Sequence, residues 1–217
     1  MRVIAKKILR EFWEVHSDCE QQLKSWFRET CSAEWKNPNE IKAEYPSASI
    51  LNDNRIVFNI KGNNYRLIVK INFEYEMVWI RFIGTHVEYD KINANTILIM
   101  NINLIKTEND YNQALERLEV IFDAKKESKE GDELELLGIL IDQYENEHFP
   151  IDLPDPIEAI KFRMEQMGYT QNDLAKIIGF KSRASEILNK KRKLSLEMIR
   201  QLHTSLNIPT DVLIQTY

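Results

Sequence analysis

The sequence predicts an α+β domain followed by an all-α domain. Two observations support this. After about residue 50 the spacing of apolar residues changes from the helical period to strict alternation, which is typical of strands. From residue 155 onward the spacing is helical again, with a cap residue before each helix. A chain of 217 residues is long enough for two small domains.

The first domain should begin with helices and continue as a small antiparallel sheet. We expect a helix over 4–14 and a second after the pair Ser17 and Glu20, which has capping-box spacing. Asn37 and Pro38 should start a short helix. Alternating apolar residues predict three strands, over 55–61, 65–71 and 77–83, with a turn at Gly62.

Two amphipathic helices should form the middle of the chain. Thr107 and Asp110 resemble a cap for the first, which would extend to about Phe122, and Gly131 is expected to break it before the second. Residues 94–106 are apolar and strand-like, unlike a conventional flexible linker. Residues 100–160 carry a net charge of −11, against +1 for residues 1–99 and +5 for 161–217. This asymmetry indicates modules with different partners.

Composition narrows the functional classes. No apolar run reaches the roughly 18 residues of a membrane helix, and charges interrupt any signal-peptide core at the N-terminus. Cys19 and Cys31 form no CxxC motif, which argues against a disulfide scaffold or zinc ribbon and favours the cytoplasm. We expect no metal, no cofactor and no membrane partner.

The strongest motif is a helix-turn-helix. Thr170 caps one short helix, Gly179 provides the turn and a second helix runs from about Ser182 to Asn189, so that it can enter a DNA major groove. Seven Lys or Arg residues lie between Lys176 and Lys193 against one acid, a charge that favours the phosphate backbone. The candidate DNA-binding residues are Lys181, Ser182, Arg183, Ser185, Glu186, Lys190, Lys191 and Arg192, with Arg183 assigned to a guanine.

With Gln171, Ala175 and Gly179 in place, residues 155–217 resemble the lambda-repressor-like (XRE) helix-turn-helix family. The wider stretch from about Met100, including DPIEAIKFRMEQ and SRASEILNKKRKLSLEMIR, resembles HigA-type antitoxins. This resemblance implies a segment that neutralises a toxin, and a domain that binds operator DNA and represses its own promoter.

The motifs RIVFNIKGNNYRLIVKINF and WIRFIGTHVEYD resemble HigB-type toxins. Those toxins are RelE-like endoribonucleases that cut mRNA, typically on the ribosome, without a metal. Such cleavage needs cations on the phosphate and groups that move protons. By this resemblance Arg66, Lys70 and Arg81 are candidate phosphate binders, and His86 and Tyr89 are candidate acid and base.

Other residue types have ordinary explanations. We expect the tryptophans, Trp79 among them, in the core or an interface rather than as stacking platforms. An acidic cluster could cover the cationic toxin surface or could be a solvated helix start. Its members are Glu127, Glu130, Asp132, Glu133 and Glu135.

The interpretation is a toxin–antitoxin pair in one polypeptide. A HigB-like domain would occupy residues 1–97, a linker and acidic neutralisation segment 98–150, and the helix-turn-helix domain 151–217. The partners would be mRNA, operator DNA and the other half of the pair, within one chain or between chains, and a homodimer is expected because one short helix reads one half-site. The alternative is a transcriptional regulator whose N-terminal domain is catalytically inert.

Overall fold

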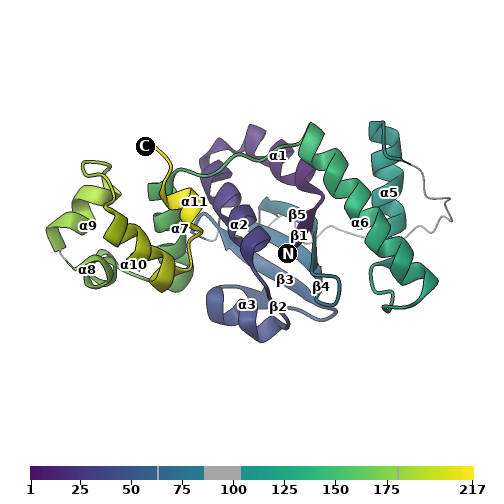
Figure 1. The fold of residues 1–217 in the computed structure, drawn as a ribbon, viewed down its shortest axis with the longest axis horizontal. Helices are drawn as coiled ribbons and strands as arrows, with labels where there is room; N and C mark the ends of the chain where they lie inside the picture. The colour runs from purple at the N-terminus through teal and green to yellow at the C-terminus, as the bar shows by residue number, and fades with distance from the viewer. Residues whose placement is uncertain (63, 86–103, 180) are drawn as a thin grey trace.

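The computed structural model describes residues 1–62, 64–85, 104–179 and 181–217. A five-stranded sheet lies at the centre of the molecule (Figure 1). Helices α5 and α6 lie at one end of the view, and the C-terminal helices α7 to α11 lie at the other. The acidic and the basic parts of the chain therefore flank the N-terminal domain on two sides.

The N-terminal domain consists of helices and one five-stranded sheet. The spatial order of the strands in the sheet is β1-β5-β4-β3-β2. Its elements are β1 (Arg2–Ile4), α1 (Lys6–Val15), η1 (Ser17–Cys19), α2 (Glu20–Ser32), α3 (Pro38–Glu44), β2 (Ser49–Ile50), β3 (Arg55–Ile60), β4 (Tyr65–Asn72) and β5 (Met77–Thr85). The three predicted strands are confirmed as β3, β4 and β5, but the prediction of a purely antiparallel sheet is wrong because β1 pairs parallel to β5. The strand β1 has only three residues and lies directly before a helix, so its sequence is too short to show the alternation by which a strand could be recognised.

The start of α2 also differs from the prediction. Ser17 begins the short 3-10 helix η1, and no side chain caps α2. Asn37 does cap α3, accepting hydrogen bonds from the backbone N–H groups of Asn39 and Glu40, with Pro38 in the first turn. The cap before α3 is therefore confirmed and the capping box before α2 is wrong.

The two faces of the sheet have different neighbours. On one face Phe58 packs edge-on against Trp26 of α2 and against Tyr45, so this face forms the core beneath the N-terminal helices. On the other face the strand register places Lys70 of β4 directly opposite Arg55 of β3 and Trp79 of β5. The register shifts beside Ile68, so that Arg81 is an extra residue in β5.

Helices α5 (Glu108–Ile121) and α6 (Lys129–His148) pack on the N-terminal domain and share its core through Tyr111, Leu118 and Leu134. The Thr107 and Asp110 capping box is confirmed. Gly131 does not break a helix as predicted, because it lies in the first turn of α6. A Cβ at this position would collide with the Lys125 carbonyl and the Tyr75 hydroxyl, so the glycine permits a close approach.

The C-terminal helices are α7 (Pro156–Met167), α8 (Gln171–Ile178), α9 (Lys181–Leu188), α10 (Leu196–Leu206) and α11 (Thr210–Leu213). The predicted caps are confirmed at Asp155, Thr170 and Ser195, and Gly168 and Gly179 both adopt the left-handed conformation that ends a helix. These helices enclose a second core of their own. Among the described residues, no helix has the length and apolar character needed to cross a membrane.

Candidate functional site

Two of the predicted phosphate-binding cations lie together on the sheet face that the N-terminal helices leave uncovered. Lys70 of β4 and Arg81 of β5 flank Trp79, and the Arg81 guanidinium lies 3.9 Å from the centre of the indole ring. Arg66 is on the same side of β4 as Lys70, because it lies four residues away along a strand with alternating sides. We call Arg66, Lys70, Trp79 and Arg81 the cationic face.

Lys70 has a carboxylate partner within the N-terminal domain. Asp53 lies 3.4 Å from the Lys70 ammonium and 3.5 Å from the Arg55 guanidinium. Arg55 and Lys70 are directly opposed like charges, an arrangement that destabilises a sheet unless an anion lies between them. Asp53 supplies that anion from a turn in which both Asp53 and Asn54 have positive φ.

The C-terminal end of α5 and the residues after it cover the cationic face. Glu119 is 2.5 Å from Arg81, and Asp123 is 2.5 Å from Lys70. Between them Phe122 packs on Trp79 with a centroid separation of 5.3 Å. The three side chains Glu119, Phe122 and Asp123 are here called the α5 clasp.

The clasp is fixed by a backbone contact and by burial. Asn72 of β4 donates a hydrogen bond of 2.8 Å to the Phe122 carbonyl. Phe122 is fully buried, and Trp79 beneath it is 6% exposed. The carboxylates from beyond the N-terminal domain that meet Lys70 and Arg81 are thus in the clasp, whereas in the acidic cluster at 127–135 Glu133 forms an ion pair with Arg117 of α5.

The remaining predicted catalytic residues are placed as follows. His86 and Tyr89 lie outside the described residues. The last residue before them, Thr85, pairs with Tyr65 at the start of β4, next to Arg66. Sequence reasoning missed Trp79, Phe122, Asp53 and the two clasp carboxylates. One signal could have found the carboxylates: Glu119 and Asp123 are four residues apart, on one side of the predicted helix.

A second contact joins α6 to the first helix of the chain. The Glu145 carboxylate accepts hydrogen bonds from the Lys6 backbone N–H at 3.0 Å and from the Tyr111 hydroxyl at 2.6 Å. It therefore satisfies a free donor at the start of α1, where Ala5 has a φ of 66°. Burial raises the pKa of Glu145 to about 7, against the opposing effect of its hydrogen bonds.

A third contact joins α7 to α2. Arg163 of α7 is 3.4 Å from the Glu29 carboxylate, which also accepts a hydrogen bond of 2.5 Å from the Tyr45 hydroxyl. The Arg163 guanidinium lies over the Tyr45 ring and donates to the Leu206 carbonyl at 2.8 Å. Burial raises the pKa of Glu29 to about 7, and the Arg163 charge opposes this shift.

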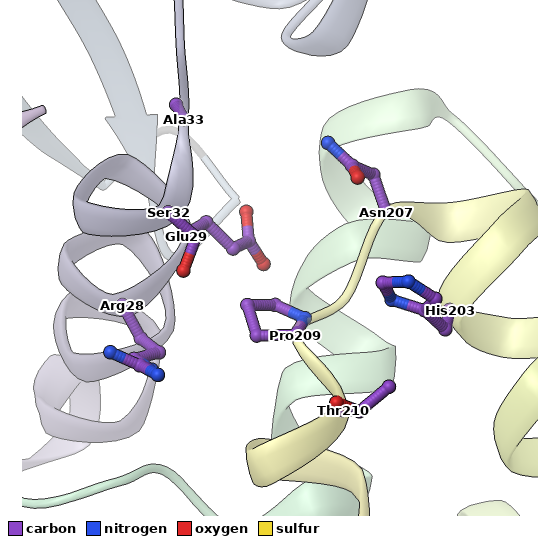
Figure 2. A pocket seen from close by; sticks show the side chains of 8 residues that line it. All are labelled: Arg28, Glu29, Ser32, Ala33, His203, Asn207, Pro209 and Thr210. Atoms are coloured by element: carbon purple, nitrogen blue, oxygen red, sulfur yellow. The ribbon is translucent and has the colours of Figure 1, made fainter.

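A cavity of about 320 Å³ opens beside this contact, between the end of α2 and the start of α11. Figure 2 shows Glu29 extending from α2 toward Pro209, with Asn207 and His203 on the other wall. Glu29 Oε1 has no hydrogen-bond partner among the described residues. None of the predicted site residues lines this cavity.

The predicted DNA-binding residues lie on and after α9, which together with α8 forms the end of the molecule farthest from α5 (Figure 1). Ala184 and Ile187 are buried, so Ser182, Arg183, Ser185 and Glu186 lie on the sides of α9 that the core does not use. Five charged side chains of the set are exposed or partly exposed: Arg183, Glu186, Lys190, Lys191 and Arg192.

Several side chains of this set have partners within the described part of the chain. Arg192 forms an ion pair of 2.5 Å with Glu186, and Lys190 forms one of 2.7 Å with Asp155, the cap of α7. Lys181 begins α9. Within the described ranges, no group of three or more His, Cys, Asp or Glu side chains is placed to hold a metal ion.

Comparisons with known proteins agree with the two halves of this architecture. The HigB toxin family, described as the RelE-like toxic component of a toxin-antitoxin system, matches residues 19–92, and a helix-turn-helix family matches residues 160–213. The mRNA interferase toxin HigB of Escherichia coli K12 is 30% identical over 96 residues, which are 43% of this chain and 92% of that protein. The mRNA interferase HigB of Shigella flexneri gives the same identity and coverage. The chain therefore belongs to the HigB toxin family and carries a helix-turn-helix domain in the same polypeptide.

Proposed function

We propose that this chain is a toxin–antitoxin pair in one polypeptide. Its N-terminal domain is a metal-independent endoribonuclease, and its downstream part both inhibits that domain and binds operator DNA. The observation that supports this most strongly is the α5 clasp, in which Glu119 and Asp123 neutralise Arg81 and Lys70. An RNA phosphate and these carboxylates would need the same cations.

The proposed chemistry uses the 2′-hydroxyl of the RNA as the nucleophile. Arg66, Lys70 and Arg81 neutralise the charge that develops on the phosphate, and His86 and Tyr89 move the protons to and from the reacting oxygens. A histidine has a pKa suited to this task near neutral pH. The names of the relatives, mRNA interferases, support RNA as the substrate class of this domain, on or off the ribosome.

Inhibition in the intact chain follows from charge and from covalent linkage. The clasp places two carboxylates on the cations and an apolar ring over Trp79, so a polyanion is repelled as well as excluded. Because the inhibitor is part of the same chain, its local concentration can reach the order of millimolar. The resting chain is then a silent nuclease.

The downstream half is proposed to repress its own promoter. The helix α9 enters the major groove, Arg183 contacts a guanine, and the basic residues around it contact phosphates. Two chains bind as a homodimer, because one short helix covers one half-site. With α9 at the end of the molecule away from the clasp, DNA binding and inhibition of the nuclease can occur in the same chain (Figure 1).

Growth arrest by residues 1–97 tests the enzymatic half. The relative from E. coli is matched over 92% of its length by 96 residues, so this fragment corresponds to nearly a whole relative. We expect arrest on expression, relief by His86→Ala with Tyr89→Phe, and no relief by the matched pair His16→Gln with Tyr75→Phe. The purified fragment should cleave RNA equally well with and without EDTA. A folded fragment that neither arrests growth nor cleaves RNA would leave a transcriptional regulator with an inert N-terminal domain.

A further inference from the structure

Trp79 differs from the other buried tryptophans of the N-terminal domain in what covers it. Trp26 contacts Phe58, Trp35 contacts Tyr45, and Trp13 lies beneath the Lys24 ammonium, and all of these neighbours belong to the same domain. Trp79 lies on the opposite face of the sheet, and its aromatic neighbour is Phe122 of the clasp, 43 residues further along the chain. If the clasp leaves, Trp79 loses this cover.

The surroundings of Trp79 are those of a nucleotide site. Lys70 is directly opposite on β4, and the Arg81 guanidinium lies 3.9 Å from the indole centroid. An aromatic ring between two cations matches a nucleotide, whose base presents a flat π-face and whose phosphates carry the charge. Proteins that bind single-stranded nucleic acid combine these two elements, a stacking platform and a positively charged groove.

The clasp resembles such a ligand in its order of groups. Glu119 and Asp123 place a carboxylate on Arg81 and on Lys70, and Phe122 places an aromatic ring against Trp79, with the two ring planes tilted by 46°. The Phe122 ring also lies 5.7 Å from the Lys70 ammonium, so both partners of this ring belong to the cationic face. Charge neutralisation alone would not require an aromatic residue between the two acids.

We propose that Trp79 is a base-stacking subsite for single-stranded RNA, and that Phe122 occupies the position of the stacked base in the silent chain. This inference rests on the proposed function, because it assigns a base to the same site at which Lys70 and Arg81 hold phosphates. Trp79 then positions the RNA and moves no proton. It also makes the clasp a mimic of a nucleotide with two flanking phosphates.

The test uses the full chain with the clasp weakened by Glu119→Gln, Phe122→Ala and Asp123→Asn, called the opened chain. The probe is a six-residue 2′-O-methyl oligoadenylate, which lacks the 2′-hydroxyl nucleophile and so is not cleaved. The comparison probe is the same backbone without bases. We expect the opened chain to bind oligoadenylate more tightly than the abasic strand, and Trp79→Leu to reduce oligoadenylate affinity by about five- to a hundredfold. The affinity for the abasic strand should not change.

The conservative variant separates stacking from a structural role. Trp79→Phe in the opened chain keeps a ring, so it should retain most of the preference for oligoadenylate while losing the part of the tryptophan fluorescence that the probe quenches. Equal losses on both strands, or no loss on either, would overturn the inference. If the probe quenched the tryptophan fluorescence of Trp79→Phe as strongly as that of the opened chain, the inference would also be overturned. If the opened chain bound neither strand, the proposed phosphate grip of Lys70 and Arg81 would fail instead.

Discussion

The Arg81 guanidinium of β5 forms a 2.5 Å ion pair with the Glu119 carboxylate of α5. The two residues are 38 positions apart, and Arg81 belongs to the N-terminal domain whereas Glu119 belongs to the acidic segment that follows it. Arg81 is the extra residue at the irregular point in the β4 and β5 register. A bulge of this kind redirects a side chain. The bulge and the end of α5 thus bring a candidate phosphate binder and a carboxylate together.

The contact between α2 and α7 should depend on Arg163. Replacing Arg163 with Met leaves the Glu29 carboxylate buried without its cation, which should lower the free energy of unfolding by about 3–5 kcal/mol. The double variant Glu29→Gln with Arg163→Met should recover much of that loss, since no buried charge remains. Urea unfolding of the three proteins measures this. Additive effects of the two substitutions would show that the pair is not coupled.

The stability of the chain should depend on pH through Glu145. Its pKa is raised to about 7 in the folded protein, so folding favours the protonated form. This group therefore stabilises most below its unfolded pKa of about 4.3, and that stabilisation is lost as pH rises toward 7. Relative to the wild type, Glu145→Gln should gain up to about 1.4 kcal/mol of unfolding free energy per pH unit between pH 5 and 7. Its relative stability should be constant above pH 8.

Exposed Glu147 on the same helix provides the control for this pH dependence. Glu147→Gln should follow the wild type across the whole range. If Glu145→Gln also ran parallel to the wild type from pH 5 to 8, the buried carboxylate would not have the raised pKa assigned to it.

Two glycines of α6 should respond in opposite directions to alanine. In Gly131→Ala the new methyl group meets the Lys125 carbonyl, which is backbone and cannot move alone, so we expect a loss of about 1–3 kcal/mol. In Gly138→Ala the methyl group meets the terminal methyl of Met77, which can rotate away, and alanine favours the helix by up to about 1 kcal/mol. Thermal unfolding should therefore rank Gly131→Ala well below Gly138→Ala. The reverse order would mean that the loop before α6 adapts more easily than the side chain of Met77.

Operator binding should depend on Arg183 more than on other cations of the C-terminal half. If Arg183 contacts a guanine, Arg183→Ala should weaken binding by about 1–3 kcal/mol on the operator and by much less on random DNA. Arg200 on α10 is an exposed cation outside the predicted site, and Arg200→Ala should have a small effect on both. Equal affinities of wild type and Arg183→Ala for the operator would remove Arg183 from base recognition.

The sequence was most informative where a local signal is sufficient. The caps at Thr107, Asp155 and Thr170 each depend on a side chain and a backbone donor within a few residues, and all three are present in the structure. By contrast β1 depends on pairing with β5, more than 70 residues away. Its three residues carry no periodic pattern that could predict this pairing.

In the candidate site, too, local features could be predicted from the sequence and long-range contacts could not. Alternation along β4 predicts that Arg66 and Lys70 share a face, as the strand pairing requires. For the partner of that face, net charge left two alternatives for the dense acidic cluster at 127–135, a cover for the cations or a solvated helix start, and in the structure most of this cluster is exposed. Contact is determined instead by where α5 ends over the sheet, and this places Glu119 and Asp123 on the cations. Trp79 was expected in the core or an interface, and the structure confirms an interface with Phe122.

The most direct test of the account is RNA cleavage by the full chain after charge reversal in the clasp. Glu119→Lys with Asp123→Lys should repel Arg81 and Lys70 and convert a silent chain into an active ribonuclease. The matched control, Glu127→Lys with Glu130→Lys, makes the same change in net charge within the exposed acidic cluster and should stay silent. A folded clasp variant that cleaves no more RNA than the wild type, or a wild-type chain that is already fully active, would contradict the account.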